Sequence, residues 1–356
     1  MEVNSYTRLR QRLDSLPNGF PATPEGTELR ILRKLFTPAE AELASHLRLT
    51  RESPAQVAER TGGNPKEVRL MLKSMAQRGL IEAGRIEGGL GYGLMPFVVG
   101  IYEMQGPTLD AELAELFEAY YQQALGRMLG VQPSVHRVIP VQESVRMDLA
   151  IQPYESAVQI VERAQAWGVL DCICRKQKAL VGDPCEHPID ICMTLSNRPG
   201  AFDNSPAVRA LSLEEALSTL QRAARAGLVH SVSNNQRGTW YICNCCTCSC
   251  GILRGIAELG IANAVARSAF VNTVDEDLCL GCGDCLEGCQ FGALTLDLTA
   301  QVDALRCVGC GVCVQFCEEG ALRLVRRLEE SEPPESELVW LQQRALSRGL
   351  DLDEVL

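Results

Sequence analysis

Long apolar runs are missing from this chain of 356 residues. Its longest apolar stretches, such as residues 97–102, are far shorter than the roughly 20 residues that a membrane-spanning helix needs. Residues 1–19 are polar and charged and lack the apolar segment of a secretory signal. We therefore expect neither membrane insertion nor secretion. The length predicts two or three domains rather than one.

An excess of positive charge is also missing. The chain has 34 Lys and Arg against 45 Asp and Glu, a formal net charge of −11, which argues against a generic nucleic-acid binder. The sequence contains no phosphate-binding P-loop, no GxGxxG turn after a strand and no Ser/His/Asp constellation. We therefore do not expect the chain to catalyse bond chemistry alone.

Cysteine, in contrast, is abundant, with 17 residues. A disulfide scaffold is typical of short secreted chains, whereas these cysteines stand in CxC and CxxC clusters of a long chain without a visible leader. This usage predicts metal binding in a reducing cytoplasm.

The C-terminal third contains the same cysteine motif twice, C-x2-C-x2-C-x3-C. The first copy is Cys279, Cys282, Cys285 and Cys289, and the second is Cys307, Cys310, Cys313 and Cys317. This is the ligand spacing of two [4Fe–4S] clusters, in which the fourth ligand of each comes from the other copy because the local loop cannot close. We therefore predict one cluster on Cys279, Cys282, Cys285 and Cys317, and the other on Cys289, Cys307, Cys310 and Cys313.

The segments around the two motifs repeat as well. Gly281, Gly283 and Gly292 recur in register as Gly309, Gly311 and Gly320. The repeat predicts a duplicated half-domain with approximate two-fold symmetry and short strands at residues 295–297 and 323–325. The glycines would let the backbone turn with positive φ and bring amide groups close to the cluster sulfurs.

Residues 275–325 resemble the bacterial two-cluster ferredoxins, and this resemblance implies electron transfer. One departure is that Gln290 and Glu318 stand where that family usually has proline. The alternative of two structural zinc sites would use the same CxxC pairs, but zinc sites close with four local ligands and do not need the x3-Cys extension. The segment is also acidic, which would steer it towards basic patches on redox protein partners.

Residues 28–94 are predicted to form helices followed by a hairpin. Ser53 and Pro54 begin one helix, and Asn64 begins a longer helix with an apolar stripe. The pattern looks like a winged helix-turn-helix, with Lys66, Arg69 and Lys73 on the exposed face of its last helix. This fold binds DNA in some proteins and partner proteins in others, and we favour protein docking because the basic excess is small.

The middle segment, residues 101–270, is predicted to be helical and rich in cysteine. A helix capped by Thr108 is expected to place an aromatic stripe in the core, and residues 154–167 are expected to form another helix. Near the end of the segment, a capping box of Ser212 and Glu215 begins a second helix-plus-hairpin unit. Nine cysteines lie here: Cys172, Cys174, Cys185, Cys192, Cys243, Cys245, Cys246, Cys248 and Cys250. Thiolates this close repel one another unless a metal shares their charge. We predict at least one further iron–sulfur cluster, with zinc as the alternative. His187 is a candidate ligand, but because it stands beside a proline we interpret it as a loop residue. The spacing does not decide which cysteines share a centre.

These segments predict an α+β, multi-domain protein. The predicted parts are a winged helix-turn-helix-like domain (1–100), a helical cysteine-rich domain (101–270), a two-cluster ferredoxin domain (271–328) and a linker with a C-terminal helix (329–356). Over its whole length the order of motifs resembles large cytoplasmic 4Fe-4S binding proteins of anaerobic bacteria. That resemblance implies electron transfer.

The favoured function is an iron–sulfur electron carrier that serves a larger oxidoreductase system. One alternative is a redox-sensing winged-helix transcription regulator, although we do not expect sequence-specific DNA binding. Another is an enzyme whose substrate binds an open iron in the middle domain.

Overall fold

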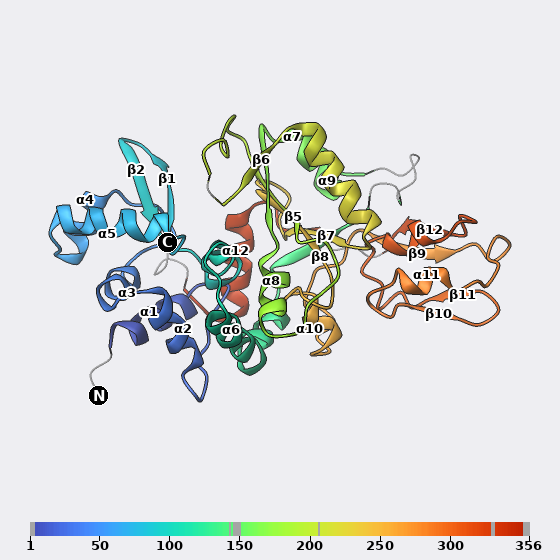
Figure 1. The fold of residues 1–356 in the computed structure, drawn as a ribbon, viewed down its shortest axis with the longest axis horizontal. Helices are drawn as coiled ribbons and strands as arrows, with labels where there is room; N and C mark the ends of the chain where they lie inside the picture. The colour runs from blue at the N-terminus through green and yellow to red at the C-terminus, as the bar shows by residue number, and fades with distance from the viewer. Residues whose placement is uncertain (1–3, 142–143, 145–150, 206, 329–331, 352–356) are drawn as a thin grey trace. The chain divides into compact units, whose positions relative to one another are not determined.

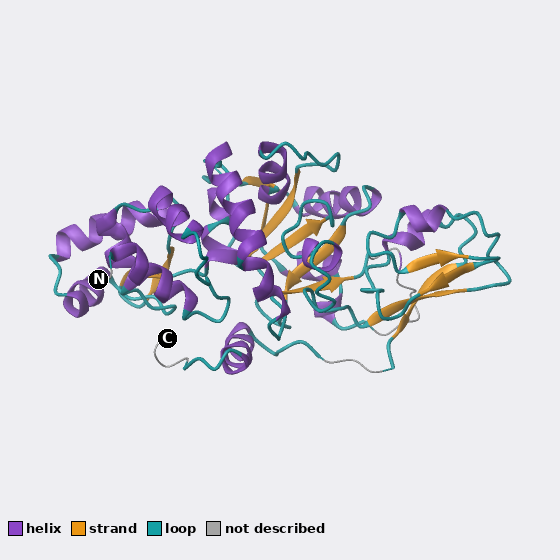
Figure 2. Cartoon of the chain, turned by 90° about the horizontal axis from the view of Figure 1, so that it is seen from below, coloured by secondary structure: helices purple, strands orange, loops and turns teal. Residues whose placement is uncertain are grey.

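The computed structural model describes residues 4–141, 144, 151–205, 207–328 and 332–351. Figure 1 labels the helices and strands along the chain. Contacts between residues divide the chain into two compact units. The first comprises residues Met1–Val131, Lys176–Asp183 and Leu341–Leu356, and the second comprises Gln132–Arg175 and Pro184–Trp340. The chain is thus a multi-domain protein with both helices and sheets (Figure 2). Among the described residues, no helix has the length and apolar character needed to cross a membrane.

The first unit is mainly helical. Its elements up to the hairpin are α1 (Ser5–Asp14), α2 (Thr27–Leu35), α3 (Pro38–Ser45), α4 (Pro54–Thr61), α5 (Pro65–Gln77), β1 (Glu82–Ile86) and β2 (Gly89–Gly93). Strands β1 and β2 pair antiparallel. Three further pieces belong wholly or partly to this unit: α6 (Ala111–Gln123), the end of α8 (Ile173–Leu180) and most of α12 (Glu337–Ser347).

Local sequence explains where α4 and α5 begin and end. Ser53 and Gln56 form a capping box at the start of α4, with Pro54 in the first turn, and Gly62 ends the helix in the left-handed conformation. The Asn64 side chain accepts hydrogen bonds from the first amides of α5. The predicted starts of both helices are confirmed, while the assignment as a winged helix stays a prediction.

Helix α5 has one buried and one exposed face. Val68, Leu72 and Met75 are buried, whereas Lys66, Arg69 and Lys73 are exposed, as the sequence pattern predicts. Leu70 lies on the exposed side too, with 68% of its surface accessible. The face therefore carries a few positive charges and one apolar side chain.

Aromatic side chains around α6 form a core within the first unit. Tyr102 stacks on Phe117 with ring centroids 3.6 Å apart, and Phe20 packs against Phe97 and Tyr120. The structure confirms that the aromatic stripe of this helix is core. Asp110, and not Thr108 as the sequence suggested, caps the helix.

The second unit is built on a six-stranded antiparallel sheet in the order β3-β7-β8-β5-β4-β6. Its strands are β3 (His136–Ile139), β4 (Ala166–Asp171), β5 (Asp190–Ser196), β6 (Arg209–Leu211), β7 (Val229–Ser233) and β8 (Tyr241–Cys245). The prediction of a helical middle segment is therefore wrong. The expected helix at residues 154–167 ends at Arg163, and strand β4 begins three residues later.

Two helices cover one face of this sheet, namely α7 (Ala157–Arg163) and α9 (Leu213–Arg225). The residues that form this core include Ile139, Val161, Val169, Met193, Leu220, Val232 and Ile242. Ser212 and Glu215 form the predicted capping box of α9, and β7 and β8 form the predicted hairpin. The second helix-plus-hairpin unit is confirmed.

The C-terminal cysteine motifs lie in a segment with two small sheets. Strand β9 (Phe270–Val274) pairs with β12 (Leu322–Arg326), and β10 (Leu294–Leu296) pairs with β11 (Ala300–Val302). The two short strands predicted here are present within a residue or two. Helix α11 (Asp284–Glu287) lies within the first motif and carries Cys285, and the helical turn Val312–Phe316 lies within the second and carries Cys313. Helix α10 (Arg254–Ala257) precedes the segment.

The compact units do not follow the four predicted segments. The first unit extends to Val131 and includes part of α12, and one unit holds the six-stranded sheet together with both cysteine motifs. The predicted C-terminal helix is present as α12, whereas residues 329–331 of the predicted linker lie outside the described residues.

We expect weak DNA binding without sequence preference, because α5 presents three exposed cations and the chain is acidic. Three phosphate contacts would give a salt dependence with a slope of about −3 in log K against log salt. Fluorescence anisotropy with duplexes of different sequence at increasing salt measures this slope. Tight, salt-resistant binding of one promoter sequence would contradict the expectation.

Candidate metal centres

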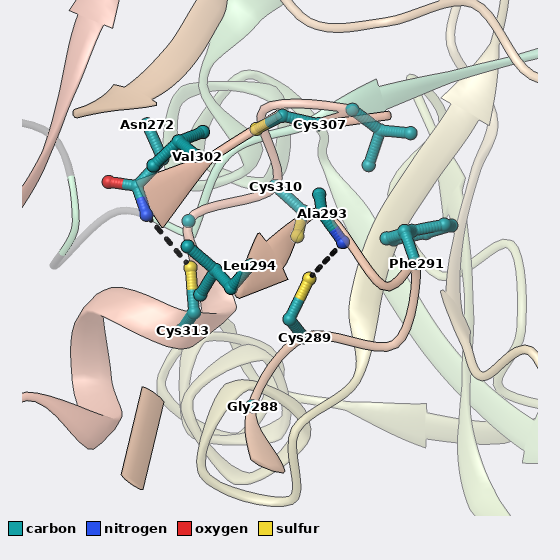
Figure 3. A pocket seen from close by; sticks show the side chains of 12 residues that line it. Asn272, Gly288, Cys289, Phe291, Ala293, Leu294, Val302, Cys307, Cys310 and Cys313 are labelled. Atoms are coloured by element: carbon teal, nitrogen blue, oxygen red, sulfur yellow. Dashed lines mark hydrogen bonds between the residues drawn. The ribbon is translucent and has the colours of Figure 1, made fainter. Parts of the chain in front are cut away.

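Four of the eight C-terminal cysteines line one pocket (Figure 3). They are Cys289, Cys307, Cys310 and Cys313, so the pocket draws on both copies of the motif. The Asn272 side-chain amide donates to Cys313 Sγ over 3.2 Å, and the backbone amide of Ala293 donates to Cys289 Sγ over 3.3 Å. Such donors stabilise thiolate sulfur and favour a bound cluster. The pocket therefore offers four thiols and two sulfur-directed donors.

The other four cysteines also approach one another. Burial raises the pKa of the Cys285 thiol, and the neighbouring thiols of Cys317, Cys282 and Cys279 raise it further. The backbone amide of Ala300 donates to Cys279 Sγ over 3.4 Å. This set again combines three cysteines of one motif with one of the other.

Matching hydrogen bonds reflect the internal repeat. The amide of Ala293 donates to Cys289 Sγ, and the amide of Ala321 donates to Cys317 Sγ over 3.2 Å, in each case from four residues further along the chain. Asn272 breaks this symmetry. Among the hydrogen bonds described for the eight sulfurs, only the one to Cys313 comes from a side chain.

Burial makes these thiols poor acids in the absence of a metal. It raises the pKa of Cys310 to about 12 and that of Cys313 higher still, and in both cases the adjacent thiols add to the effect. Thiolates can therefore persist together in this pocket only if cations share their charge. The donor set fits iron–sulfur ligation.

Close backbone approach explains two of the repeated glycines. Gly309 has a φ of +72°, and a Cβ there would lie 2.0 Å from the Phe270 carbonyl oxygen. Its counterpart Gly281 has a φ of +68°, and a Cβ there would lie 2.6 Å from the Leu298 carbonyl oxygen. Any larger residue would force the metal-binding loops apart.

The nine middle cysteines separate into two groups. The pairing of β5 with β8 explains the first group. Met193 of β5 pairs with Ile242 of β8, and both side chains lie in the apolar core. Because side chains alternate along a strand, Cys192, Cys243 and Cys245 lie on the opposite face of the sheet. Helices α7 and α9 cover the apolar face. The alternation of side chains thus gathers cysteines on the face that these helices leave open.

Three cysteines outside these strands complete a group of six. The six-cysteine group is Cys172, Cys174, Cys192, Cys243, Cys245 and Cys250. Hydrogen bonds from Cys174 and Cys192 lower the pKa of Cys172 well below its usual value, although burial opposes this. Hydrogen bonds from Cys243 and Cys250 likewise lower the pKa of Cys245 to about 6.

The remaining four thiols of the six-cysteine group have raised pKa values. The neighbouring thiols and burial together cause this in Cys174, Cys192 and Cys243. In Cys250 the hydrogen bond with Cys174 opposes the increase that Cys245 and burial cause. The six thiols thus form a connected set of contacts that a metal centre could replace.

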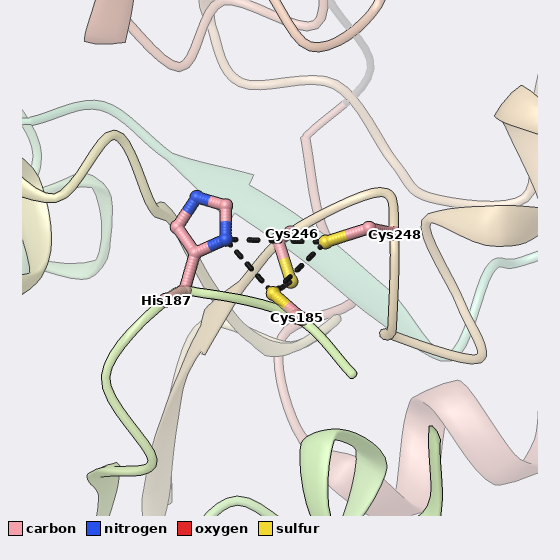
Figure 4. Close-up of side chains that lie close together, drawn as sticks. All are labelled: Cys185, His187, Cys246 and Cys248. Atoms are coloured by element: carbon pink, nitrogen blue, oxygen red, sulfur yellow. Dashed lines mark hydrogen bonds between the residues drawn. The ribbon is translucent and has the colours of Figure 1, made fainter. Parts of the chain in front are cut away.

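The second group combines three cysteines with His187 (Figure 4). Cys185 Sγ lies 3.1 Å from Cys248 Sγ and 3.7 Å from Cys246 Sγ. The His187 Nδ1 atom lies 2.9 Å from Cys185 Sγ and 3.9 Å from Cys248 Sγ. All four ligand atoms lie within 4.8 Å of one another. His187, interpreted from sequence as a loop residue, therefore faces three thiols.

Sequence reasoning missed several residues around these cysteines. Arg175 is buried and donates to Cys246 Sγ over 3.5 Å and to the carbonyl oxygens of Pro188 and Asn244. Ser231 Oγ lies 3.4 Å from Cys245 Sγ and 3.4 Å from the ring of buried His136. Arg175 directly follows Cys174 in the sequence, whereas no sequence signal joined Ser231 to Cys245 or brought the distant His136 beside them.

Comparison with protein families gave two matches. The 4Fe-4S binding domain family matches residues 272–295 and again residues 300–323. Comparisons with curated proteins and with solved structures gave no match. The tandem matches agree with a two-cluster ferredoxin domain and support an iron–sulfur electron-transfer role. The middle cysteines offer a possible site for another metal.

Replacing single cysteines tests how the two motifs share their ligands. Cys317→Ser should damage the cluster of Cys279, Cys282 and Cys285, although Cys317 stands in the second motif. Its matched control, Cys289→Ser, should damage the cluster of Cys307, Cys310 and Cys313. EPR of the reduced proteins distinguishes the two signals. Loss in Cys317→Ser of the cluster bound by Cys307 would disprove the crossed assignment.

Alanine variants of two glycines with similar φ distinguish the effect of backbone strain from that of steric collision. Gly309→Ala places a Cβ 2.0 Å from a carbonyl oxygen, whereas Gly320 has a φ of +65° and open space around its Cβ position. We expect Gly320→Ala to cost about 1 kcal/mol and keep the iron, and Gly309→Ala to lose iron from the domain. Anaerobic iron and sulfide analysis measures the difference. Equal iron retention would show that close approach is unimportant.

Proposed function

We propose that the chain is an electron-transfer component of a larger oxidoreductase system and carries two [4Fe–4S] clusters on its eight C-terminal cysteines. One observation carries the proposal: the eight cysteines come in two sets of four, and each set draws on both motifs. When bound, such clusters supply one-electron carriage. The protein contributes thiolates, amide donors to sulfur and a nearby surface for a partner.

The two cluster sites differ in their access to solvent. Cys282 is exposed, whereas Cys307 and Cys313 are buried. Buried Asn272 adds a side-chain hydrogen bond to Cys313, and hydrogen bonds to sulfur raise the reduction potential of a cluster. The exposed site at Cys282 is therefore the proposed point where electrons enter or leave.

An apolar surface surrounds Cys282. Leu280 and Leu298 have 73% and 88% of their surface exposed, and Leu278 and Leu296 are also exposed. The Leu298 carbonyl approaches Gly281, and the Leu296 side chain approaches Gly283, so both leucines flank the Cys282 loop. Exposed apolar side chains that surround a functional group are typical of a docking site.

Acidic side chains accompany this surface. The exposed acids of the segment are Glu276, Asp277, Asp284, Glu287, Asp297, Asp303, Glu318 and Glu319. Their charge favours a partner whose redox site lies in a basic surface. We therefore propose a basic redox protein as the partner.

The six-cysteine group is proposed to hold a third iron–sulfur cluster, for which four of its thiols suffice. Among the described residues, only Cys185, His187, Cys246 and Cys248 have ligand atoms that all lie within 4.8 Å of one another, close enough for a single ion. The sulfur atoms of the six-cysteine group therefore do not all lie within that distance of one another. Wider spacing favours a multi-iron cluster, because its thiolates bind different iron atoms.

Electron transfer to a basic c-type cytochrome tests the function and the docking surface together. The reduced protein should reduce the cytochrome at a rate that falls as salt increases, because salt screens the attraction. Leu298→Ser should slow the second-order rate about fivefold, equivalent to about 1 kcal/mol of lost docking energy, with unchanged cluster potentials. Stopped-flow absorbance measures the rate.

Leu346→Ser is the matched control, since Leu346 is also an exposed leucine, with 80% of its surface accessible, and lies in the other compact unit. It should leave the rate unchanged. A reduced protein that passes no electrons to the cytochrome, or one whose rate is independent of salt, would contradict the proposed role.

A further inference from the structure

The nine middle cysteines need not share one centre, because four ligands of the second group surround a much smaller space than a cluster occupies. In tetrahedral zinc sites the metal lies about 2.3 Å from sulfur and about 2.0 Å from nitrogen, so two sulfur ligands lie about 3.8 Å apart and a sulfur and a nitrogen about 3.5 Å apart. The four described distances are 3.1 and 3.7 Å from Cys185 Sγ to the other two sulfurs, and 2.9 and 3.9 Å from His187 Nδ1 to Cys185 and Cys248. They lie within about 0.7 Å of this tetrahedral spacing, and all four ligand atoms lie within 4.8 Å of one another.

The ligands come from two separate loops. Cys185 and His187 lie between α8 and β5, and Cys246 and Cys248 lie just after β8. Cys246 is fully buried and packs with Ile191 of the hydrophobic core, whereas Cys248 is exposed. A shared ion would therefore join the two loops at the surface of the sheet and fix an otherwise irregular segment.

The surrounding groups suit a bound cation with thiolate ligands. Arg175 donates to Cys246 Sγ over 3.5 Å, and Ser249 Oγ donates to Cys248 Sγ over 3.9 Å. Burial and the hydrogen bonds with the neighbouring thiols of Cys185 and Cys246 raise the pKa of Cys248, and a bound cation would favour its thiolate form.

We propose that Cys185, His187, Cys246 and Cys248 hold a single structural zinc ion that is separate from the iron–sulfur centres. Three sulfurs and one imidazole nitrogen would fill all four positions around a tetrahedral ion, which is the arrangement of structural zinc sites. The inference does not depend on the electron-transfer role, because it rests on the geometry of these four residues alone.

The loop after β8 that carries Cys246 and Cys248 also anchors the C-terminal segment. The amide of Thr247, between two zinc ligands, donates to the Gln290 side-chain oxygen over 2.8 Å, and the Gln290 side-chain amide donates to the Gly227 carbonyl oxygen. Gln290 directly follows Cys289, where two-cluster ferredoxins usually have proline. The ion thus fixes the loop to which the cluster-binding segment attaches.

Metal analysis of the full-length protein, purified without oxygen, tests the zinc assignment. The wild-type protein should contain one zinc per chain, and zinc X-ray absorption should show three sulfurs at about 2.3 Å and one nitrogen at about 2.0 Å. Four sulfurs, or no zinc in protein from zinc-replete cells, would overturn the assignment. This measurement does not require any variant to fold.

Variants then identify the ligands. Cys248→Ser should lose zinc and keep its iron, whereas the matched control Cys243→Ser, in the six-cysteine group, should keep its zinc. His187→Cys should retain the ion with four sulfur ligands, visible as a stronger thiolate charge-transfer band after cobalt substitution. Loss of iron and sulfide instead of zinc in Cys248→Ser would overturn the proposal.

Gln290→Pro restores the usual ferredoxin residue and tests the anchor. It should keep zinc and iron, while hydrogen exchange at the Thr247 amide becomes at least about tenfold faster, because the acceptor is lost. Unchanged exchange at Thr247 would disprove the anchoring role of Gln290. The zinc assignment itself is tested separately, by the metal analysis and X-ray absorption. Electron transfer that fails while zinc is present would contradict only the proposed function.

Discussion

Crowding of thiols is the constraint on which the rest of this structure depends. The protein brings seventeen cysteines into four sets, and in three of them burial or neighbouring thiols hold several pKa values well above the usual range. Sulfur atoms placed so close together repel one another when they are thiolates. When they are thiols, their burial as polar groups costs free energy. Metal ions relieve both costs, so binding them and folding these segments are coupled.

The pairing of strands in the six-stranded sheet determines which cysteines lie close together. Because side chains alternate along a strand, β5 and β8 bury Met193 and Ile242 under helices and present Cys192 and Cys243 on the other face. The chain then leaves β8 and turns, so that Cys246 and Cys248 approach Cys185 and His187, whereas Cys245 and Cys250 contact each other in the six-cysteine group. One short stretch of sequence thus supplies two centres.

Sequence predicted the local features well. The caps of α4, α5 and α9 are encoded by neighbouring residues, and the glycine-rich cysteine repeat has a fixed spacing, so both could be read directly. The six-stranded sheet could not, because its strands are only three to seven residues long and β4 follows α7 without a turn signal. Likewise, His187 joins Cys246 and Cys248 through contacts between segments some 60 residues apart, which no local pattern encodes.

The central claim is that two kinds of metal site coexist in this chain, multi-iron clusters and one tetrahedral zinc. The most direct test is an anaerobic count of iron, acid-labile sulfide and zinc per chain in the full-length protein. The account predicts about twelve iron and twelve sulfide from three [4Fe–4S] clusters, together with one zinc. Zinc alone without sulfide, or iron and sulfide without zinc, would contradict it.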